Sequence, residues 1–156
     1  MKLENEIKTS KFLSEVHKAQ LNILFTAAWL RTRISSSLKP HGITIEQFNV
    51  LRIIRGQHDQ GVLVKDITIR MLERNSNTTR IIDRLELKGL VRRVASANDR
   101  RERPVMLTAA GSALLDSVDR AWQIQNPHTA PLTTAEALLI NQLLDRMRAE
   151  PEAAPI

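Results

Sequence analysis

The sequence RIIDRLELKGLV at residues 80–91 is followed shortly by DRRERPVMLT at residues 99–108. The apolar residues of the first stretch recur at helical spacing and form one inward-facing side: Ile81, Ile82 and Leu85. Gly89 is suited to end this helix, because glycine adopts a left-handed backbone without steric cost. The two stretches therefore predict a helix that leads directly into a β-hairpin.

The hairpin and the helix before it complete a recognisable unit. Two short β-prone runs, residues 90–95 and 104–107, are separated by the polar stretch SANDRRER. A short helix is predicted for residues 65–73, and no good N-cap residue precedes it. Asn75 and Ser76 are suitable N-caps for the next helix, the one that leads into the hairpin. Two short helices, a tight connection and a hairpin with a basic tip indicate a winged helix-turn-helix.

Longer helices are predicted on both sides of this unit. A long amphipathic helix runs to about Leu38, Thr44 and Gln47 have capping-box spacing, and Thr133 and Glu136 repeat that spacing near the C-terminus. We expect a mainly α fold, with a winged helix-turn-helix core of three helices and a β-hairpin wing flanked by N- and C-terminal dimerisation helices. The expected boundaries are a single domain over 1–156, a DNA-binding lobe over 44–110, and dimerisation helices over 10–38 and 111–150.

Charge favours an anionic partner. The chain has a net charge of +6, and residues 74–103 contain nine basic and four acidic side chains, which places +5 of this charge within thirty residues. A positive charge concentrated in this way suits the phosphates of nucleic acid. The absence of cysteine excludes disulfides and thiolate chemistry. No apolar run approaches the length of a membrane span or signal peptide, so we expect a cytoplasmic protein without membrane contact.

The two quoted stretches resemble the multiple antibiotic resistance regulator (MarR) family. The first is similar to the end of the family's recognition helix and the strand after it, including the Asp83-Arg84 pair. The second has the family's wing spacing, with Asp99 at its start and Leu107-Thr108 at its end. The chain departs from the family pattern at Thr78, usually an apolar core position, and at Val64, where a helix cap is usual.

The helix and the wing carry residue types that suit duplex DNA. Polar and cationic side chains of a helix in the major groove reach base edges and phosphates. From the helix we expect DNA contacts by Ser76, Asn77, Thr79, Arg80 and Arg84, and from the wing by Arg100, Arg101 and Arg103. The resemblance implies that Asp99 pairs with Arg101 and stiffens the wing. It also implies a homodimer, formed by the terminal helices, that binds a palindromic operator and is expected to act as a repressor.

Other functions are weighed against this one. The four scattered histidines make no helical metal pair, and no nucleophile motif or phosphate-binding glycine loop is present, so we expect no enzyme, metal or cofactor. The resemblance allows a small aromatic or anionic effector, which Arg31 and Arg33 could pair with if they do not simply lie on a solvated face. Five side chains could line its cavity or pack in the core: Phe25, Trp29, Phe48, Met71 and Trp122. The competing functional class is a winged-helix module that binds protein or RNA.

Overall fold

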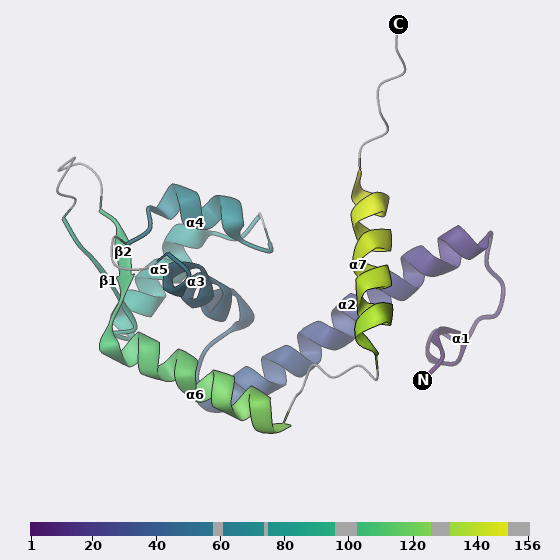
Figure 1. Cartoon of the computed structure of the whole chain (residues 1–156), viewed down its shortest axis with the longest axis horizontal. Helices are drawn as coiled ribbons and strands as arrows, with labels where there is room; N and C mark the ends of the chain where they lie inside the picture. The colour runs from purple at the N-terminus through teal and green to yellow at the C-terminus, as the bar shows by residue number, and fades with distance from the viewer. Residues whose placement is uncertain (58–60, 74, 96–102, 126–131, 150–156) are drawn as a thin grey trace, which may run out of the picture.

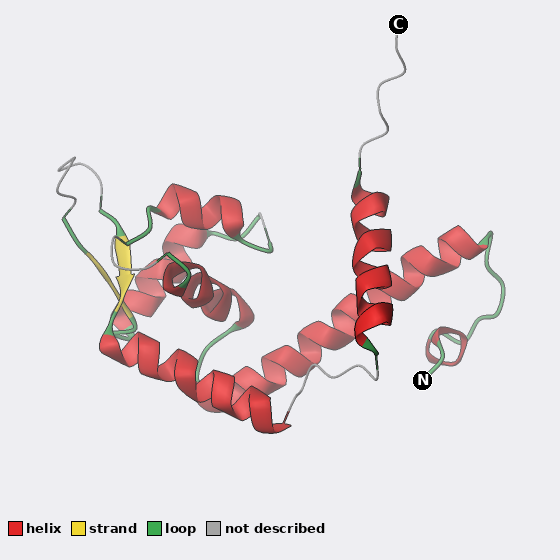
Figure 2. Cartoon of the chain, viewed as in Figure 1, coloured by secondary structure: helices red, strands yellow, loops and turns green. Residues whose placement is uncertain are grey.

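The computed structural model describes residues 1–57, 61–73, 75–95, 103–125 and 132–149. In chain order its elements are α1 (Leu3–Glu6), α2 (Glu15–Leu38), the 3-10 helix η1 (Lys39–His41), α3 (Ile45–Arg55), α4 (Val64–Arg70), α5 (Thr78–Leu87), β1 (Val91–Arg93), β2 (Val105–Leu107), α6 (Ala109–Gln125) and α7 (Thr134–Arg148). Helices dominate, and the strands form one antiparallel pair beside α5 (Figure 2). This arrangement confirms the predicted fold class.

The long helix α2 begins later than predicted. The hydroxyl of Ser14 accepts a hydrogen bond from the backbone N–H of His17 at 3.1 Å and caps the helix, so Glu15 is its first residue. The predicted start at residues 10–11 is therefore wrong. The short helix α1 was not predicted, and it is joined to α2 by an ion pair of 2.5 Å between Glu4 and Lys18.

The starts of α3 and α7 follow the predicted capping boxes. Thr44 accepts a hydrogen bond from the N–H of Gln47, and the Gln47 side chain accepts one from the N–H of Thr44, both at 3.2 Å. Thr133 and Glu136 form the same reciprocal pair at the start of α7. Each box satisfies two backbone donors that a helix start leaves free.

The helix α4 is shorter than predicted. It ends at Arg70, because Met71 takes an extended backbone that buries its side chain, and the next N–H, that of Leu72, donates to the side chain of Asn49 at 3.0 Å. The Leu72 side chain, just past the end of the helix, is 84% exposed. No side chain caps the start of α4, as the sequence led us to expect.

The hairpin pairs Val91 with Leu107 and Arg93 with Val105, and Val62 forms an additional antiparallel bridge to Val105. The strands β1 and β2 are shorter than the predicted runs 90–95 and 104–107. Gly89 has a left-handed backbone with φ +68° directly after α5, as predicted, and Gly61 has one, with φ +72°, just before the bridge.

One hydrophobic core lies under α3, α5, β2 and α6. Its most deeply buried side chains come from every element of the winged unit, from α6 and from the end of α2: Leu38, Val50, Leu51, Ile67, Ile82, Leu85, Val91, Val105, Leu115 and Val118. The helix α2 leaves this core and runs to the far side of the molecule, while α7 lies away from the winged unit (Figure 1). The apolar side chains of α7 are therefore not covered by the core.

Candidate nucleic-acid interface

The helix α5 presents one apolar and one polar face. Asn77 caps it, with its side-chain oxygen accepting the N–H of Arg80 at 3.1 Å, so the predicted caps Asn75 and Ser76 are wrong. Thr78 is 4% exposed and lies in the core, although its hydroxyl departs from the apolar side chain expected at this position. The opposite face exposes Thr79, Arg80 and Arg84. A cap that holds the first turn fixes where these side chains project.

The predicted contact residues fall into three groups. Asn77, Thr79, Arg80 and Arg84 are exposed on or just before α5, and Ser76 is partly buried beside them. Arg103 is exposed on the strand side of the wing, immediately before Pro104. Asp99, Arg100 and Arg101 lie outside the described residues, so the proposed Asp99–Arg101 pair stays a prediction.

Arg93 joins the wing to α5, a role that sequence reasoning missed. Its guanidinium lies 2.6 Å from a carboxylate oxygen of Asp83 and also binds Glu86, while its backbone N–H donates to Glu86 at 3.1 Å. The hydrogen bond to Asp83 outweighs burial and raises the pKa of Arg93 above its ordinary value. The i, i+3 spacing of Asp83 and Glu86 places them on one helix face and was the available signal.

These ion pairs also change the electrostatics of α5. Both acidic side chains of the helix, Asp83 and Glu86, are bound to a cation of the wing. Arg80 and Arg84 project from the exposed face of the same helix. The exposed face therefore keeps a positive charge that its own carboxylates do not neutralise, which suits an anionic ligand.

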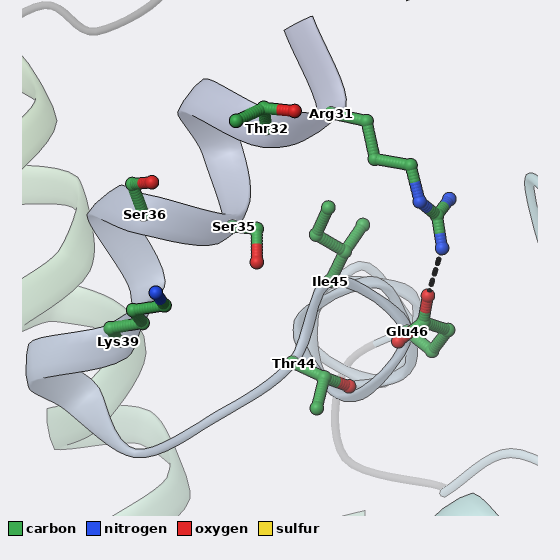
Figure 3. Close-up of a pocket in the computed structure, with 8 residues that line it drawn as sticks. All are labelled: Arg31, Thr32, Ser35, Ser36, Lys39, Thr44, Ile45 and Glu46. Atoms are coloured by element: carbon green, nitrogen blue, oxygen red, sulfur yellow. Dashed lines mark hydrogen bonds and ion pairs between the residues drawn. The ribbon is translucent and has the colours of Figure 1, made fainter. Parts of the chain in front are cut away.

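A surface cleft lies between α2 and the start of α3. It has a volume of about 460 Å³ and is lined by Arg31, Thr32, Ser35, Ser36, Lys39, Thr44, Ile45 and Glu46 (Figure 3). Arg31 crosses from α2 to α3, where it lies 2.5 Å from Glu46, and it also binds Glu73. Arg31 is thus an ion-pair partner rather than part of a merely solvated face.

The aromatic residues do not line this cleft. Phe48 and Trp122 pack edge to face with ring centroids 4.8 Å apart, and the Trp122 indole N–H donates to Ser37 at 3.2 Å. Met71 is buried, and the guanidinium of Arg33 lies 5.0 Å from the ring centroid of Trp29. These contacts support core packing for Phe48, Met71 and Trp122.

In the described ranges of the chain, no group of three or more His, Asp or Glu side chains is placed to hold a metal ion. No helix in the same ranges is long and apolar enough to cross a membrane.

Comparison with known proteins finds similarity over the winged unit. The MarR family model matches residues 43–102, which include α3, α4, α5 and β1. The winged unit of the chain is therefore similar to that of the MarR family. The HTH-type transcriptional regulator MhqR of Bacillus subtilis is 27% identical over 120 residues, which cover 76% of this chain and 81% of MhqR.

Two solved structures agree with the fold. A mutant Escherichia coli MarR complexed with operator DNA superposes with a TM-score of 0.75 and 26% identity, covering 90% of this chain and all of that one. Bordetella bronchiseptica BpsR, whose DNA binding is regulated by 6-hydroxynicotinic acid, superposes with a TM-score of 0.66 and 26% identity, covering 83% of this chain and 99% of that one.

Proposed function

We propose that this chain is a MarR-family transcriptional regulator that binds double-stranded DNA in a sequence-specific manner. The observation that carries the proposal is α5, whose exposed face presents Thr79, Arg80 and Arg84 while both of its carboxylates are bound by Arg93. A helix of this kind fits the major groove, where arginine reads guanine and reaches phosphate. The similarity to a MarR structure that holds operator DNA supports the same assignment.

The wing adds a second contact in this proposal. Arg103 is exposed beside β2, and the hairpin is tied to α5 through Arg93. We assign Arg100, Arg101 and Arg103 to the adjacent backbone or minor groove, where negative potential attracts arginine. Asp99 is assigned to the wing as a stabilising partner of Arg101.

The regulator is proposed to act as a homodimer. Several apolar side chains are exposed in the single chain on α7 and on or just before α2: Leu138, Leu139, Ile140, Leu143, Met147, Leu13, Val16 and Leu24. Pairing of these terminal helices with those of a second copy would remove a large apolar surface from water. Two α5 helices would then read an inverted repeat with half-sites about 34–36 Å apart, one helical turn of DNA. Occupation of such an operator is proposed to repress transcription.

Regulation by a small anionic or aromatic molecule is part of the same proposal. BpsR is a relative of similar fold whose DNA binding responds to 6-hydroxynicotinic acid. We assign such a molecule to the cleft beside Arg31, because the cleft volume of about 460 Å³ lies within the usual range of ligand sites.

Gel-shift measurement with three labelled probes tests the DNA-binding function. The probes are a palindromic duplex selected by the protein from a random pool, a scrambled duplex of the same composition, and a single-stranded RNA of equal length. We expect the selected duplex to bind at least a thousand-fold more tightly than the scrambled one at physiological salt. Equal binding to all three probes, or preference for RNA, would instead support the protein- or RNA-binding alternative.

A further inference from the structure

Lys88 directly follows α5, and its side chain reaches back to the start of α3. Its backbone closes the last turn of α5, where its N–H donates to the carbonyl oxygens of Arg84 and Glu86. Its side-chain ammonium donates to the backbone carbonyl of Gly42 at 2.6 Å and to Oε1 of Gln47 at 3.1 Å. These acceptors precede Lys88 by 46 and 41 residues in the sequence. The side chain therefore ties the end of α5 to a distant part of the chain.

The two acceptors lie at the junction of α2 and α3. Gly42 follows the 3-10 helix η1, which directly continues α2, and its backbone is left-handed with φ +67°. Gln47 lies in the first turn of α3 and is 5% exposed. Its Oε1 also accepts the backbone N–H of Thr44, so one oxygen completes the α3 capping box and binds Lys88. The end of α2, the start of α3 and the end of α5 are thus joined by one ammonium group.

This contact differs in its chemistry from the exposed arginines of α5. Both acceptors are uncharged oxygens, and a hydrogen bond from a cation is about twice as strong as one between neutral groups. Arg84 lies one helical turn before Lys88, is exposed, and carries a proposed DNA contact. Lys88 belongs to the same basic stretch of sequence, yet its ammonium is bound within the protein. The two cations therefore suit different tasks, Arg84 the binding of DNA and Lys88 the placement of the helix.

We propose that Lys88 is a positioning residue for operator reading, which fixes the end of α5 relative to α2 and thereby sets the half-site spacing that the dimer accepts. The inference rests on the proposed DNA-binding homodimer, in which α2 pairs with the partner copy. The distance and angle between the two α5 helices then depend on how each α5 is fixed to its own α2. Without the Lys88 contact, α5 still packs on the core through Ile82 and Leu85. Its end is held less precisely, so the dimer should tolerate a wrong spacing better.

Lys88→Met tests this role, because it keeps an unbranched side chain and removes the three ammonium donors. Three duplexes are titrated by fluorescence anisotropy: the selected operator, and two versions with one base pair inserted or deleted between the half-sites. One base pair changes the half-site separation by about 3.4 Å and the relative rotation by about 35°. We expect Lys88→Met to bind the selected operator up to about ten-fold more weakly than wild type, as for one lost hydrogen bond, and to discriminate less among the three duplexes. The slope of log affinity against log salt should not change, since no phosphate contact is lost.

Arg84→Met is the matched control, since it removes a cation from the same helix by the same replacement. It should weaken binding of all three duplexes by a similar factor and reduce the salt slope by about one. An equal reduction of the salt slope in Lys88→Met would indicate a phosphate contact and overturn the positioning role. Undiminished spacing discrimination in Lys88→Met would overturn it as well. A wild type that shows no spacing preference would instead overturn the proposed operator reading on which the inference rests.

Gln47→Glu tests the same contact from the acceptor side. Glutamate can replace glutamine in a capping box, so α3 should begin as before, and the carboxylate gives Lys88 a charged partner. We expect this substitution to sharpen spacing discrimination when Lys88 is present and to leave it unchanged in the Lys88→Met background. Equal effects in both backgrounds would overturn the link. Urea unfolding and light scattering establish that each variant is folded and dimeric. If Lys88→Met does not fold, Gln47→Glu alone decides, because unchanged discrimination there contradicts the link.

Discussion

The guanidinium of Arg93 in β1 lies 2.6 Å from the carboxylate of Asp83 in α5. This pair joins a strand of the wing to the helix that carries the proposed base contacts, across ten residues of sequence. Since Glu86 binds the same guanidinium, α5 and the wing are held in one geometry at two points. Simultaneous contact of helix and wing with one stretch of DNA depends on this geometry.

A double-mutant cycle measures the Arg93–Asp83 pair. We expect Arg93→Gln and Asp83→Asn to be coupled by up to about 1 kcal/mol in urea unfolding, because the Arg93 side chain is 22% exposed and that of Asp83 is 53% exposed. Arg93→Gln should also weaken DNA binding through the loosened wing. Additive effects of the two substitutions on both stability and DNA binding would show that the pair contributes nothing.

Gly111 is required by close packing. A Cβ at this position would lie 2.1 Å from the carbonyl oxygen of Leu90, so Gly111→Ala forces the start of α6 away from the wing. We expect a loss of about 1–3 kcal/mol or more in the free energy of unfolding. Gly42→Ala is the matched control, since a Cβ there meets nothing within 4 Å and only the φ of +67° is unfavourable. The prediction is wrong if the control costs as much as Gly111→Ala.

The homodimer is tested by light scattering coupled to size exclusion. The wild type should give about twice the chain mass of 17.7 kDa at micromolar concentration. Leu139→Glu with Leu143→Glu places two charges on one face of α7 and should produce monomers. Leu87→Glu changes a side chain that is 88% exposed on α5 and should leave the dimer intact. A monomeric wild type would rule out the proposed assembly.

Arg80 and Arg103 should respond differently when truncated. Arg80→Ala is expected to cost about 1–3 kcal/mol on the selected duplex and to relax discrimination among operator variants, because a base contact is lost. Arg103→Ala should weaken all duplexes by a similar factor and reduce the slope of log affinity against log salt by about one, as for a phosphate contact. Titrations at several salt concentrations measure both. Identical salt slopes for wild type and Arg103→Ala would remove Arg103 from the interface.

The capping box of α7 predicts a pH effect. Hydrogen bonds from the backbone N–H and hydroxyl of Thr133 lower the pKa of Glu136 below its ordinary value of 4.5. Because the pKa of Glu136 is lower in the folded protein than in the unfolded chain, its carboxylate stabilises the fold. This stabilisation is complete above the pKa of the unfolded chain and is lost as the pH falls through the pKa of the folded protein. Wild type should therefore lose stability relative to Glu136→Gln as pH is lowered from about 5. Urea midpoints of both proteins, measured at equal concentration, should diverge with acid, and parallel profiles would contradict the assignment.

Local chemistry was enough to predict several helix ends. The capping boxes at Thr44 and Thr133 need only two side chains three residues apart, and both form as predicted. The start of α5 was not fixed in this way, because three consecutive residues are good caps. Burial of Thr78 selects Asn77 over its two predecessors, and that burial depends on the packed core.

The ionic links of Arg31 could not be predicted because its partners are distant in the sequence. Glu46 and Glu73 are 15 and 42 residues from Arg31, and neither spacing carries a helical or strand signal. Arg93 was counted with the basic cluster, although two acidic side chains of α5 bind it. A charge count shows the net excess in a segment, whereas the folded chain decides which of the cations are exposed.

The bridge between Val62 and Val105 protects the wing from unwanted association. The two residues exchange backbone hydrogen bonds of 2.9 and 2.8 Å, so β2 has a neighbour on both sides. On β1 the N–H of Arg93 is occupied by the Glu86 carboxylate, and Arg92 adds an exposed charge. Open strand edges are templates for aggregation, and paired, capped or charged ones are not. In the described part of the hairpin, crowded copies of this protein thus find little free backbone on which intermolecular β-pairing could begin.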